Sequence, residues 1–346
     1  MRALAPKSRH RPILTGVFCA VFCAVTLPVV TPPARGEPAR DVRVDTLSPV
    51  DADVWDLVVA ARTFYDEDRA IELLRATIDA FDDGRRANDS DLATVLFALS
   101  GFSSLPAAEA QGLHGRALQL LRDDLATDPP ETMRGDPRAS RLLEALLFSG
   151  AFLFLRDEVK LANAREALMM APDILAPTGD DADARYESGQ ILILFTEVRR
   201  VLEHGHAAEA RQAAQAILDL YTEQLGDAHP LSMTVLFEHA WMLERHDPDT
   251  ALALLQSYFE RVFQTDMAIS YEAEQAGFVY TQLLWGQGRE EDALAHMLAM
   301  AQHHLEAMDE DSELDQAIAA RLIRDIAAED REHPALPELR RRAGLE

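Results

Sequence analysis

Histidines and carboxylates stand close together at two places where their chemistry would suit a metal ion. His204 and His206 are separated by one glycine, and His303 and His304 are adjacent. Residues two apart on a helix point to nearly opposite sides, so the first pair converges only if both lie in a turn. The acidic run at 309–313 (DEDSE) lacks the spacing of a calcium loop and is typical of a solvated helix N-terminus. We therefore expect neither a metal site nor a cofactor.

Glu187 and Ser188 form the one pair of residues in the chain that suggests catalysis. A glutamate can serve as a general acid, and the pair resembles the Glu-Ser of periplasmic lytic transglycosylases. That resemblance implies an α-superhelical enzyme that cleaves glycans, with Glu187 as the acid. The chain then continues ILILFTEV rather than with a glycine-rich stretch ending near GLMQ, and a glutamate that opens a helix explains Glu187 without chemistry. The sequence has no G-x-S-x-G, P-loop or H-E-x-x-H motif.

Aromatic, arginine and glutamine side chains recur at helical spacing in the C-terminal half. Aromatic and arginine residues dominate interaction hot spots. The candidates for partner binding are Phe195, Arg199, Phe237, Trp241, Phe278, Gln282 and Trp285. They are expected on the first helices of successive hairpins, lining a concave groove. An aromatic stripe is also typical of a repeat core, and the two interpretations stay open, with the tryptophans the stronger groove candidates.

The elements that would position these residues are helices. From residue 50 onward apolar residues recur at i, i+3, i+4 and i+7, as in Ile71, Leu74, Ile78 and Phe81. Alanine, leucine, glutamate and arginine, all good helix formers, dominate. The strand-like run 191–195 (ILILF) continues into TEVRRVLEHG, which favours a buried helix. The sequence predicts an all-α fold.

Two sets of residues give one repeat period in the C-terminal half. Ala210, Ala251 and Ala293 are 41 and 42 residues apart, and the three candidate phenylalanines are 42 and 41 apart. A small residue at a helix crossing lets two helices pack closely. Each predicted hairpin has an apolar face that it cannot bury alone, so neighbouring hairpins must stack.

These hairpins, with a glycine five residues before an alanine at Gly205/Ala210 and Gly288/Ala293, resemble tetratricopeptide repeats. The period near 42 and the linker 225–230 (LGDAHP) resemble the longer kinesin-light-chain type. The resemblance implies a right-handed α-α superhelix of about six helical hairpins that binds a protein or peptide. It is best over 183–309 and degenerate over 51–182, with 310–346 as a C-terminal capping helix and tail.

The first 36 residues have the organisation of a secretory signal peptide. A basic start is followed by an apolar stretch from Ile13 to about Val30 and by small residues near Gly36. Cleavage there would leave a linker, 37–50, and would remove Cys19 and Cys23, the only cysteines. The alternative is an uncleaved N-terminal anchor, because the stretch is near the lower limit for spanning a bilayer. We expect a periplasmic or secreted protein.

Charge restricts the class of partner. The 346 residues include 33 Lys and Arg against 59 Asp and Glu, a net charge of −26. Nucleic acid and anionic membrane surfaces would be repelled, so membrane contact is expected only through an uncleaved N-terminus. We expect a non-catalytic interaction scaffold of the bacterial cell envelope with a protein or peptide ligand, basic or of mixed charge. The alternatives are the glycan-cleaving enzyme and a structural accessory subunit of an envelope complex.

Overall fold

The computed structural model describes residues 47–63, 66–180, 184–330 and 332–345. The expected signal peptide (1–36) and most of the expected linker (37–50) lie outside the described residues. The chain forms two compact units, one ending at Arg156 and the other beginning at Asp157. Each unit is therefore described by itself.

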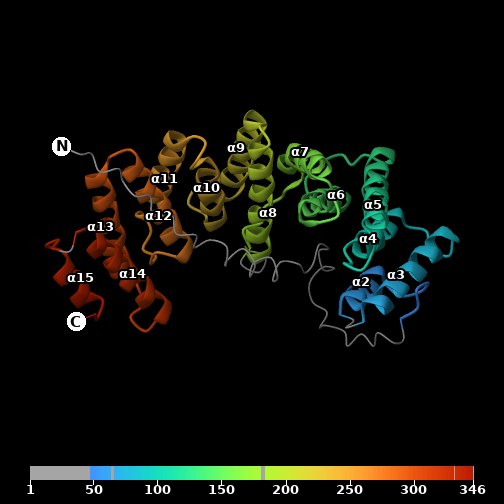
Figure 1. Ribbon diagram of the computed structural model, residues 1–346, viewed down its shortest axis with the longest axis horizontal. Helices are drawn as coiled ribbons and strands as arrows, with labels where there is room; N and C mark the ends of the chain where they lie inside the picture. Colours follow the sequence, from blue (N-terminus) through green and yellow to red (C-terminus); the bar gives the residue numbers. More distant parts are fainter. Residues whose placement is uncertain (1–46, 64–65, 181–183, 331, 346) are drawn as a thin grey trace, which may run out of the picture. The chain divides into compact units, whose positions relative to one another are not determined.

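Helices are the only regular elements of both units, and the described ranges contain no β-strand (Figure 1). The predicted all-α class is confirmed at this level. The strand-like run 191–195 lies inside a long helix, because its apolar residues continue with helical spacing on either side.

In its described residues, unit 1 contains five α-helices and a short 3-10 turn. Asp66, Asn88 and Asp136 cap three of these helices by accepting hydrogen bonds from backbone N–H groups of the first turn. The elements are α2 (Val54–Thr63), α3 (Glu67–Asp82), α4 (Asp89–Ser100), α5 (Ala107–Thr127), α6 (Pro137–Phe148) and the turn η2 (Ser149–Ala151).

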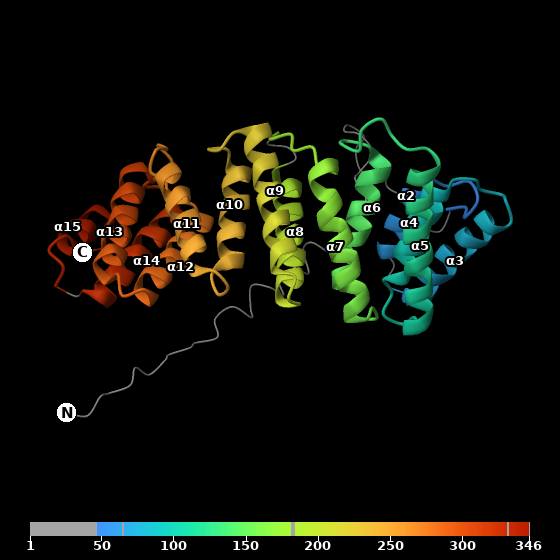
Figure 2. The same cartoon turned by 90° about the horizontal axis from the view of Figure 1, so that it is seen from above.

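Unit 2 carries the helices on which the candidate binding residues lie. They are α7 (Asp157–Ile174), α8 (Ala184–Glu203), α9 (Ala207–Leu225), α10 (Pro230–Leu243), α11 (Pro248–Val262), α12 (Tyr271–Gly286), α13 (Glu290–Ala307), α14 (Glu313–Glu329) and α15 (Leu336–Arg342). Figure 2 shows α7 to α13 following one another in chain order.

Three helical hairpins of unit 2 coincide with the three predicted repeats. Helices α8 and α9, α10 and α11, and α12 and α13 pack pairwise. The first helices also contact one another, α8 with α10 and α10 with α12. They form a layer of their own, which we call the first-helix layer.

The alanines that gave the repeat period lie on the second helix of each hairpin. Ala210, Ala251 and Ala293 are fully buried. Gly205 and Gly288 turn the chain between paired helices with φ of +88° and +73°, a region that glycine enters without steric cost. The middle hairpin turns instead at Asp247, whose side chain caps α11. The small residues thus serve the close packing expected of them.

Candidate functional site

Arg199 of α8 and Trp241 of α10 lie together in the first-helix layer. The Arg199 Cζ is 4.9 Å from the centroid of the Trp241 ring, and its Nη1 donates a hydrogen bond of 3.1 Å to Oε2 of Glu238. The Trp241 ring stacks on Phe237, with centroids 5.7 Å apart and planes 12° from parallel. These four residues are called the Trp241 cluster. Two neighbouring repeats therefore contribute to one arrangement of side chains.

Burial and charge fix the Trp241 cluster in place. The Glu238 side chain is 2% exposed and that of Arg199 is 23% exposed. Burial raises the pKa of Glu238, while the guanidinium of Arg199 opposes that rise. A guanidinium over an indole contributes about 0.5–2 kcal/mol, more as water is excluded. The arginine is thereby held flat between a buried carboxylate and a half-buried ring.

The remaining candidate residues divide by exposure. Phe195 is fully buried and lies in the core, with its ring centroid 6.5 Å from that of His239. Phe278 is 53% exposed, Gln282 is exposed, and Trp285 is half-buried. These last three residues follow one another at spacings of four and three on α12, so they share one face. We call them the α12 stripe.

Tyr271 extends the α12 stripe and was not among the predicted site residues. It lies seven residues before Phe278, at the first position of α12, and is 53% exposed. The seven-residue spacing Tyr271, Phe278, Trp285 was readable in the sequence. The other two repeats have no aromatic residue at the position equivalent to Tyr271, so the repeat pattern does not mark it.

Buried carboxylates form a second feature of this layer that the sequence did not predict. Glu197 of α8 accepts a 2.8 Å hydrogen bond from Nε of Arg200, and burial raises its pKa. Glu274 of α12 pairs with Arg321 of α14 at 2.9 Å. With Glu238 and Arg199, three buried glutamates are thus each paired with an arginine. Glu238 with Arg199 joins α10 to α8, and Glu274 with Arg321 joins α12 to α14, whereas Glu197 and Arg200 lie one turn apart on α8. Removing one partner of such a pair would leave a charge buried alone.

Glu272, in the first turn of α12, has a different environment, in which hydroxyl groups take the place of an arginine. Its Oε2 accepts a 2.9 Å hydrogen bond from Oγ1 of Thr234 on α10, and the Tyr258 hydroxyl of α11 also hydrogen-bonds to it. Burial, reinforced by the charge of Glu238, raises the pKa of Glu272 to about 7. Three helices therefore meet at a carboxyl group that changes its charge near neutral pH.

The histidine pairs singled out in the sequence have structural partners. His304 is fully buried: its Nδ1 accepts a hydrogen bond from Ile269 N at 3.1 Å, and its Nε2 donates to Asp315 O at 2.8 Å. The Nε2 of His303 lies 2.9 Å from Met267 O. His204 Nδ1 lies 2.8 Å from Arg200 O, one turn back on its own helix. Within the described ranges no three His, Cys, Asp or Glu residues are grouped as a metal site would require.

Three other histidines are buried in apolar surroundings that the sequence gave no reason to expect. The ring of His296 contacts the rings of Phe259 and Tyr280, with centroids 4.3 and 4.6 Å away. Burial lowers the pKa of His296 to about 3, and it lowers the pKa values of His114 and His239 to about 4. These side chains are neutral at physiological pH and act as core aromatics.

Glu187, the candidate general acid, caps a turn of backbone. Its Oε1 accepts hydrogen bonds from both N and Oγ1 of Thr178, at 2.9 and 2.8 Å. The side chain is buried, with 6% of its surface exposed. Its contacts hold residue 178 against the start of α8.

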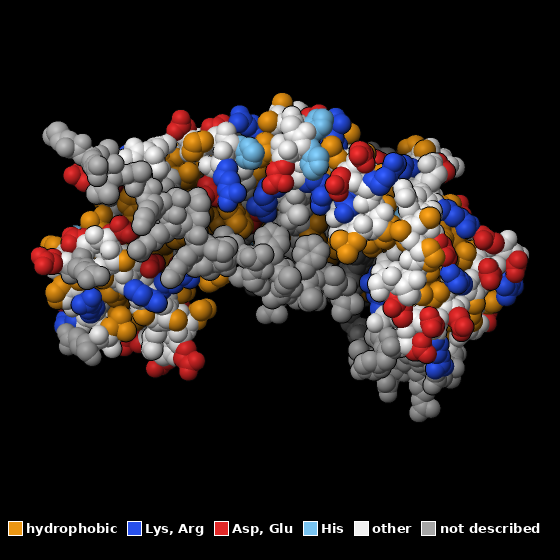
Figure 3. Space-filling model, viewed as in Figure 1, with side chains coloured by type: hydrophobic (Ala, Val, Ile, Leu, Met, Phe, Trp, Pro, Cys, Tyr) orange, Lys and Arg blue, Asp and Glu red, His pale blue; other side chains and the backbone are white. Residues whose placement is uncertain are grey.

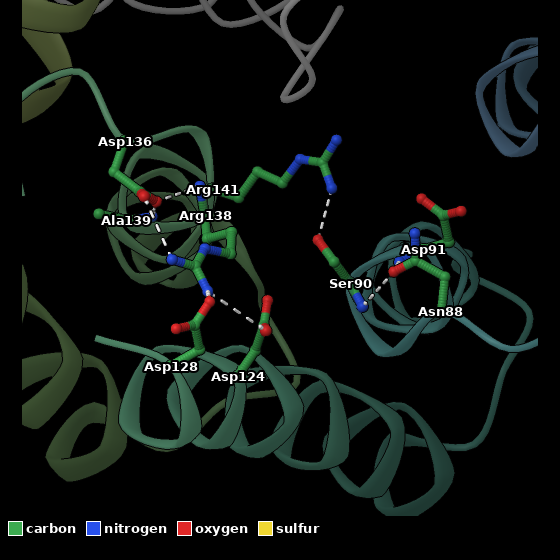
Figure 4. A network of polar contacts seen from close by, with 9 residues as sticks. All are labelled: Asn88, Ser90, Asp91, Asp124, Asp128, Asp136, Arg138, Ala139 and Arg141. Atoms are coloured by element: carbon green, nitrogen blue, oxygen red, sulfur yellow. Dashed lines mark hydrogen bonds and ion pairs between the residues drawn. The ribbon is translucent and has the colours of Figure 1, made fainter. Parts of the chain in front are cut away.

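Unit 1 contains a separate polar network around α6. Arg138 reaches the carboxylates of Asp124 on α5 and of Asp128 just after it, at 3.8 and 3.4 Å, and that of Asp136 at 3.4 Å (Figure 4). Asp136 also caps α6 through the N–H groups of Arg138 and Ala139. The network joins the end of α5 to the beginning of α6.

Arg141 extends this network toward α4. Its Nη1 donates a hydrogen bond to Oγ of Ser90, across the space between α6 and α4 in Figure 4. Asn88 caps α4 at the same end, through the N–H groups of Ser90 and Asp91. These contacts order the helix ends of unit 1 and present no open binding surface of their own.

A shallow groove on the other layer of unit 2 runs between α9 and α11. It is lined by Gln215, Leu218, Asp219, Thr222, Glu223 and Arg261. Its mixed charges and wide opening give it no feature that would select a ligand. The sequence analysis proposed no residue there.

The surface mixes charge types. Figure 3 shows acidic side chains, arginines and small hydrophobic patches interspersed on one face, with no continuous basic area. No helix in the described part of the chain has the length and apolarity to cross a membrane. Comparison of the chain with protein-family models, curated proteins and solved structures finds no significant match. The described structure therefore identifies this chain only as an all-helical protein whose helices pack in neighbouring hairpins.

Proposed function

We propose that this protein is a non-catalytic interaction scaffold, which binds a protein or peptide on the first-helix layer of unit 2. The Trp241 cluster and the α12 stripe together form the binding surface. The observation that carries the proposal is the contact between Arg199 and Trp241, because it assembles hot-spot residue types from two repeats on one layer. Phe195 and Phe237 support this surface from the core.

The proposed architecture is a right-handed solenoid of the tetratricopeptide kind with about six hairpins. Three features support it: the period of 41 and 42 residues, the fully buried alanines at equivalent positions, and the positive-φ glycines of two turns. A solenoid presents the first helices of successive hairpins side by side, which suits an extended ligand.

The chemistry of the proposed surface favours side-chain recognition of a ligand. Phe278, Gln282 and Trp285 carry no charge, although 27% of the residues in the chain are charged. Aromatic rings contribute apolar contact area, and the glutamine amide and indole N–H donate hydrogen bonds. Arg199 is already paired with Glu238, so it contributes shape more than free charge.

The proposed compartment is the periplasm or the exterior of the cell. The basic, apolar and small-residue order of residues 2–36 supports it. N-terminal sequencing of protein recovered from the cell envelope is expected to begin near residue 37. Recovery of Met1, or a pool that stays embedded in the membrane, would overturn this part of the proposal.

Site-specific crosslinking tests the binding surface. A photoreactive residue at Gln282 is expected to crosslink one defined protein or peptide from envelope extract. The same residue at Gln302, exposed on α13, is expected to crosslink none. Trp241→Ala combined with Trp285→Ala should reduce the yield at Gln282 more than tenfold while circular dichroism stays helical.

Two outcomes would contradict the proposed function. Equal crosslinking at Gln282 and Gln302 would place the interaction elsewhere, as expected for a structural accessory subunit. Release of glycan fragments from envelope material by the wild type, and not by Glu187→Gln, would establish the glycan-cleaving enzyme instead.

A further inference from the structure

Three exposed apolar side chains stand at or next to the starts of α12 and α14. Met267, just before α12, is 69% exposed, Tyr271 at its first position is 53% exposed, and Leu314 in the first turn of α14 is 60% exposed. Burying large apolar side chains of this kind stabilises a protein or a complex. A large apolar group left in water therefore indicates a contact surface when several occur together.

Buried hydrogen bonds hold these two helix starts together. His304 of α13 accepts a hydrogen bond from Ile269 N and donates one to Asp315 O, so one imidazole joins the approach to α12 to the first turn of α14. His303 Nε2 lies 2.9 Å from Met267 O. Figure 1 places α12, α13 and α14 next to one another. We call Met267, Tyr271 and Leu314 the apolar patch.

Carboxylates surround the apolar patch. Asp266 precedes Met267, and Asp309, Glu310, Asp311 and Glu313 lead into Leu314. All five side chains are exposed, and no arginine, lysine or histidine of the described residues forms an ion pair with them. We call these five residues the acidic rim.

The loop that carries the acidic rim is shaped by its own hydrogen bonds. Asp309 Oδ1 accepts from Asp311 N at 3.0 Å, and Asp309 N donates to Oδ2 of Asp315 at 3.0 Å. Gln316 donates to Glu310 O. Four carboxylates of the rim are thus presented from an ordered turn, which lowers the ordering cost of binding a partner.

We propose that the apolar patch and the acidic rim form a second docking surface, and that its partner is a basic amphipathic helix. The apolar face of that helix packs on Met267, Tyr271 and Leu314. Its lysines and arginines pair with the rim carboxylates. This inference goes beyond the proposed function. Tyr271 also extends the α12 stripe, but Met267, Leu314 and the acidic rim do not belong to it, and binding here needs neither Arg199 nor Trp241.

Charge complementarity favours a basic amphipathic helix over a second copy of the chain or an anionic membrane. A second copy of the chain would bring an identical acidic rim and a net charge of −26 against the first, and like charges facing each other oppose association. An anionic membrane surface would be repelled for the same reason. A helix that is apolar on one face and basic on its flanks satisfies both parts of the surface.

A designed peptide serves as the probe. It is a helical peptide of leucine and lysine with all leucines on one face, and its matched control carries glutamate in place of lysine. Fluorescence anisotropy of the labelled peptides with the full chain is expected to show saturable binding of the lysine peptide only. Raised salt should weaken that binding, because exposed charges are screened within about 8–10 Å.

Matched variants distinguish peptide binding at the docking surface from a general attraction to the acidic protein. Glu310→Gln, Asp311→Asn and Glu313→Gln together should weaken binding at least tenfold. The same number of neutralised carboxylates elsewhere in unit 2, Glu260→Gln, Glu290→Gln and Glu291→Gln, should change it less than twofold.

The apolar part is tested with Met267→Ser, Tyr271→Ser and Leu314→Ser, which alter only exposed side chains and should preserve the helical signal. These three changes should also weaken binding at least tenfold, whereas Trp241→Ala should leave it unchanged. Equal losses with both sets of neutralised carboxylates would overturn the proposal. Unchanged peptide binding by the serine variant would also overturn it. So would the finding that the wild type is a dimer and that the serine variant is a monomer, because the patch would then bind a second copy of the chain.

Discussion

Gly277 of α12 faces Met300 of α13 so closely that a Cβ on the glycine would lie 2.3 Å from the methionine Sδ. Met300 is buried, with 2% of its surface exposed. A side chain at position 277 therefore requires the thioether to move within a closed core. The sulfur and methyl end of Met300 fills the space next to this glycine.

Gly277→Ala should lower the free energy of unfolding by about 1–2 kcal/mol. Overpacking lowers the free energy of unfolding by about 1–3 kcal/mol. The higher helix propensity of alanine offsets less than about 1 kcal/mol of that loss. Denaturant melts of Gly277→Ala, Met300→Ala and the double variant measure the coupling between the two positions. We expect a coupling energy of about 1 kcal/mol or more, and additive effects would contradict the close contact.

Leucine at the equivalent alanines of two repeats should destabilise unit 2. Ala251 and Ala293 have no exposed surface, so Ala251→Leu and Ala293→Leu must displace neighbouring atoms, at about 1–3 kcal/mol each. Glu291→Ala, on the exposed side of α13, should cost less than about 0.5 kcal/mol. Similar small effects at all three positions in a denaturant melt would show that the repeat register is wrong.

The free energy of unfolding should fall sharply when Arg199 is removed and Glu238 is kept. Arg199→Met leaves the buried Glu238 carboxylate without its cation and should cost about 3–5 kcal/mol. Adding Glu238→Gln removes the buried charge and should recover most of that loss. Thermal unfolding of the two single variants and the double variant tests this. A double variant as unstable as Arg199→Met would show that lost packing, rather than charge, is the cause.

Glu272 should make stability depend on pH near neutrality. Its pKa of about 7 in the folded protein is above the ordinary value of 4.5, so between these values the folded state binds the proton more tightly. The contribution of Glu272 therefore increases as the pH falls through 7 and is lost as the pH rises above it. The neutral variant Glu272→Gln should gain stability relative to the wild type by about 1 kcal/mol between pH 6 and pH 8.

The control for that prediction replaces a glutamate that is exposed to solvent. Glu291→Gln should keep a constant difference from the wild type over the same range, because its side chain is exposed on α13. Chemical unfolding at pH 6, 7 and 8 supplies the measurement. A difference between wild type and Glu272→Gln that does not change with pH would rule out titration of Glu272 in this range.

Apolar periodicity was enough to predict the helices and the three matched hairpins of unit 2. The period of 41 and 42 residues located Ala210, Ala251 and Ala293 correctly as fully buried contacts. The same period could not predict exposure of the aromatic residues. Phe195 is fully buried, whereas Phe278 is 53% exposed, because burial depends on what the following hairpin places above each ring.

Long-range pairing explains what the sequence left unpredicted at the site. Glu238 and Glu274 stand among apolar residues, yet their arginine partners lie 39 and 47 residues away in the chain. No local pattern links a glutamate to an arginine at such separations. The contact between Arg199 and Trp241 also depends on the packing of α8 against α10, which periodicity alone does not align to a single side chain.

The extensive helix contacts of unit 2 join helices that follow one another or have one helix between them. A hairpin in such an arrangement meets only its neighbours, and stability is approximately a sum over local interfaces. Duplication of one 41-residue segment would therefore lengthen the chain while creating only one kind of new interface, the one between the two copies. Evolution can enlarge a protein of this kind by copying a hairpin, and a laboratory can do the same by inserting a second α10–α11 segment.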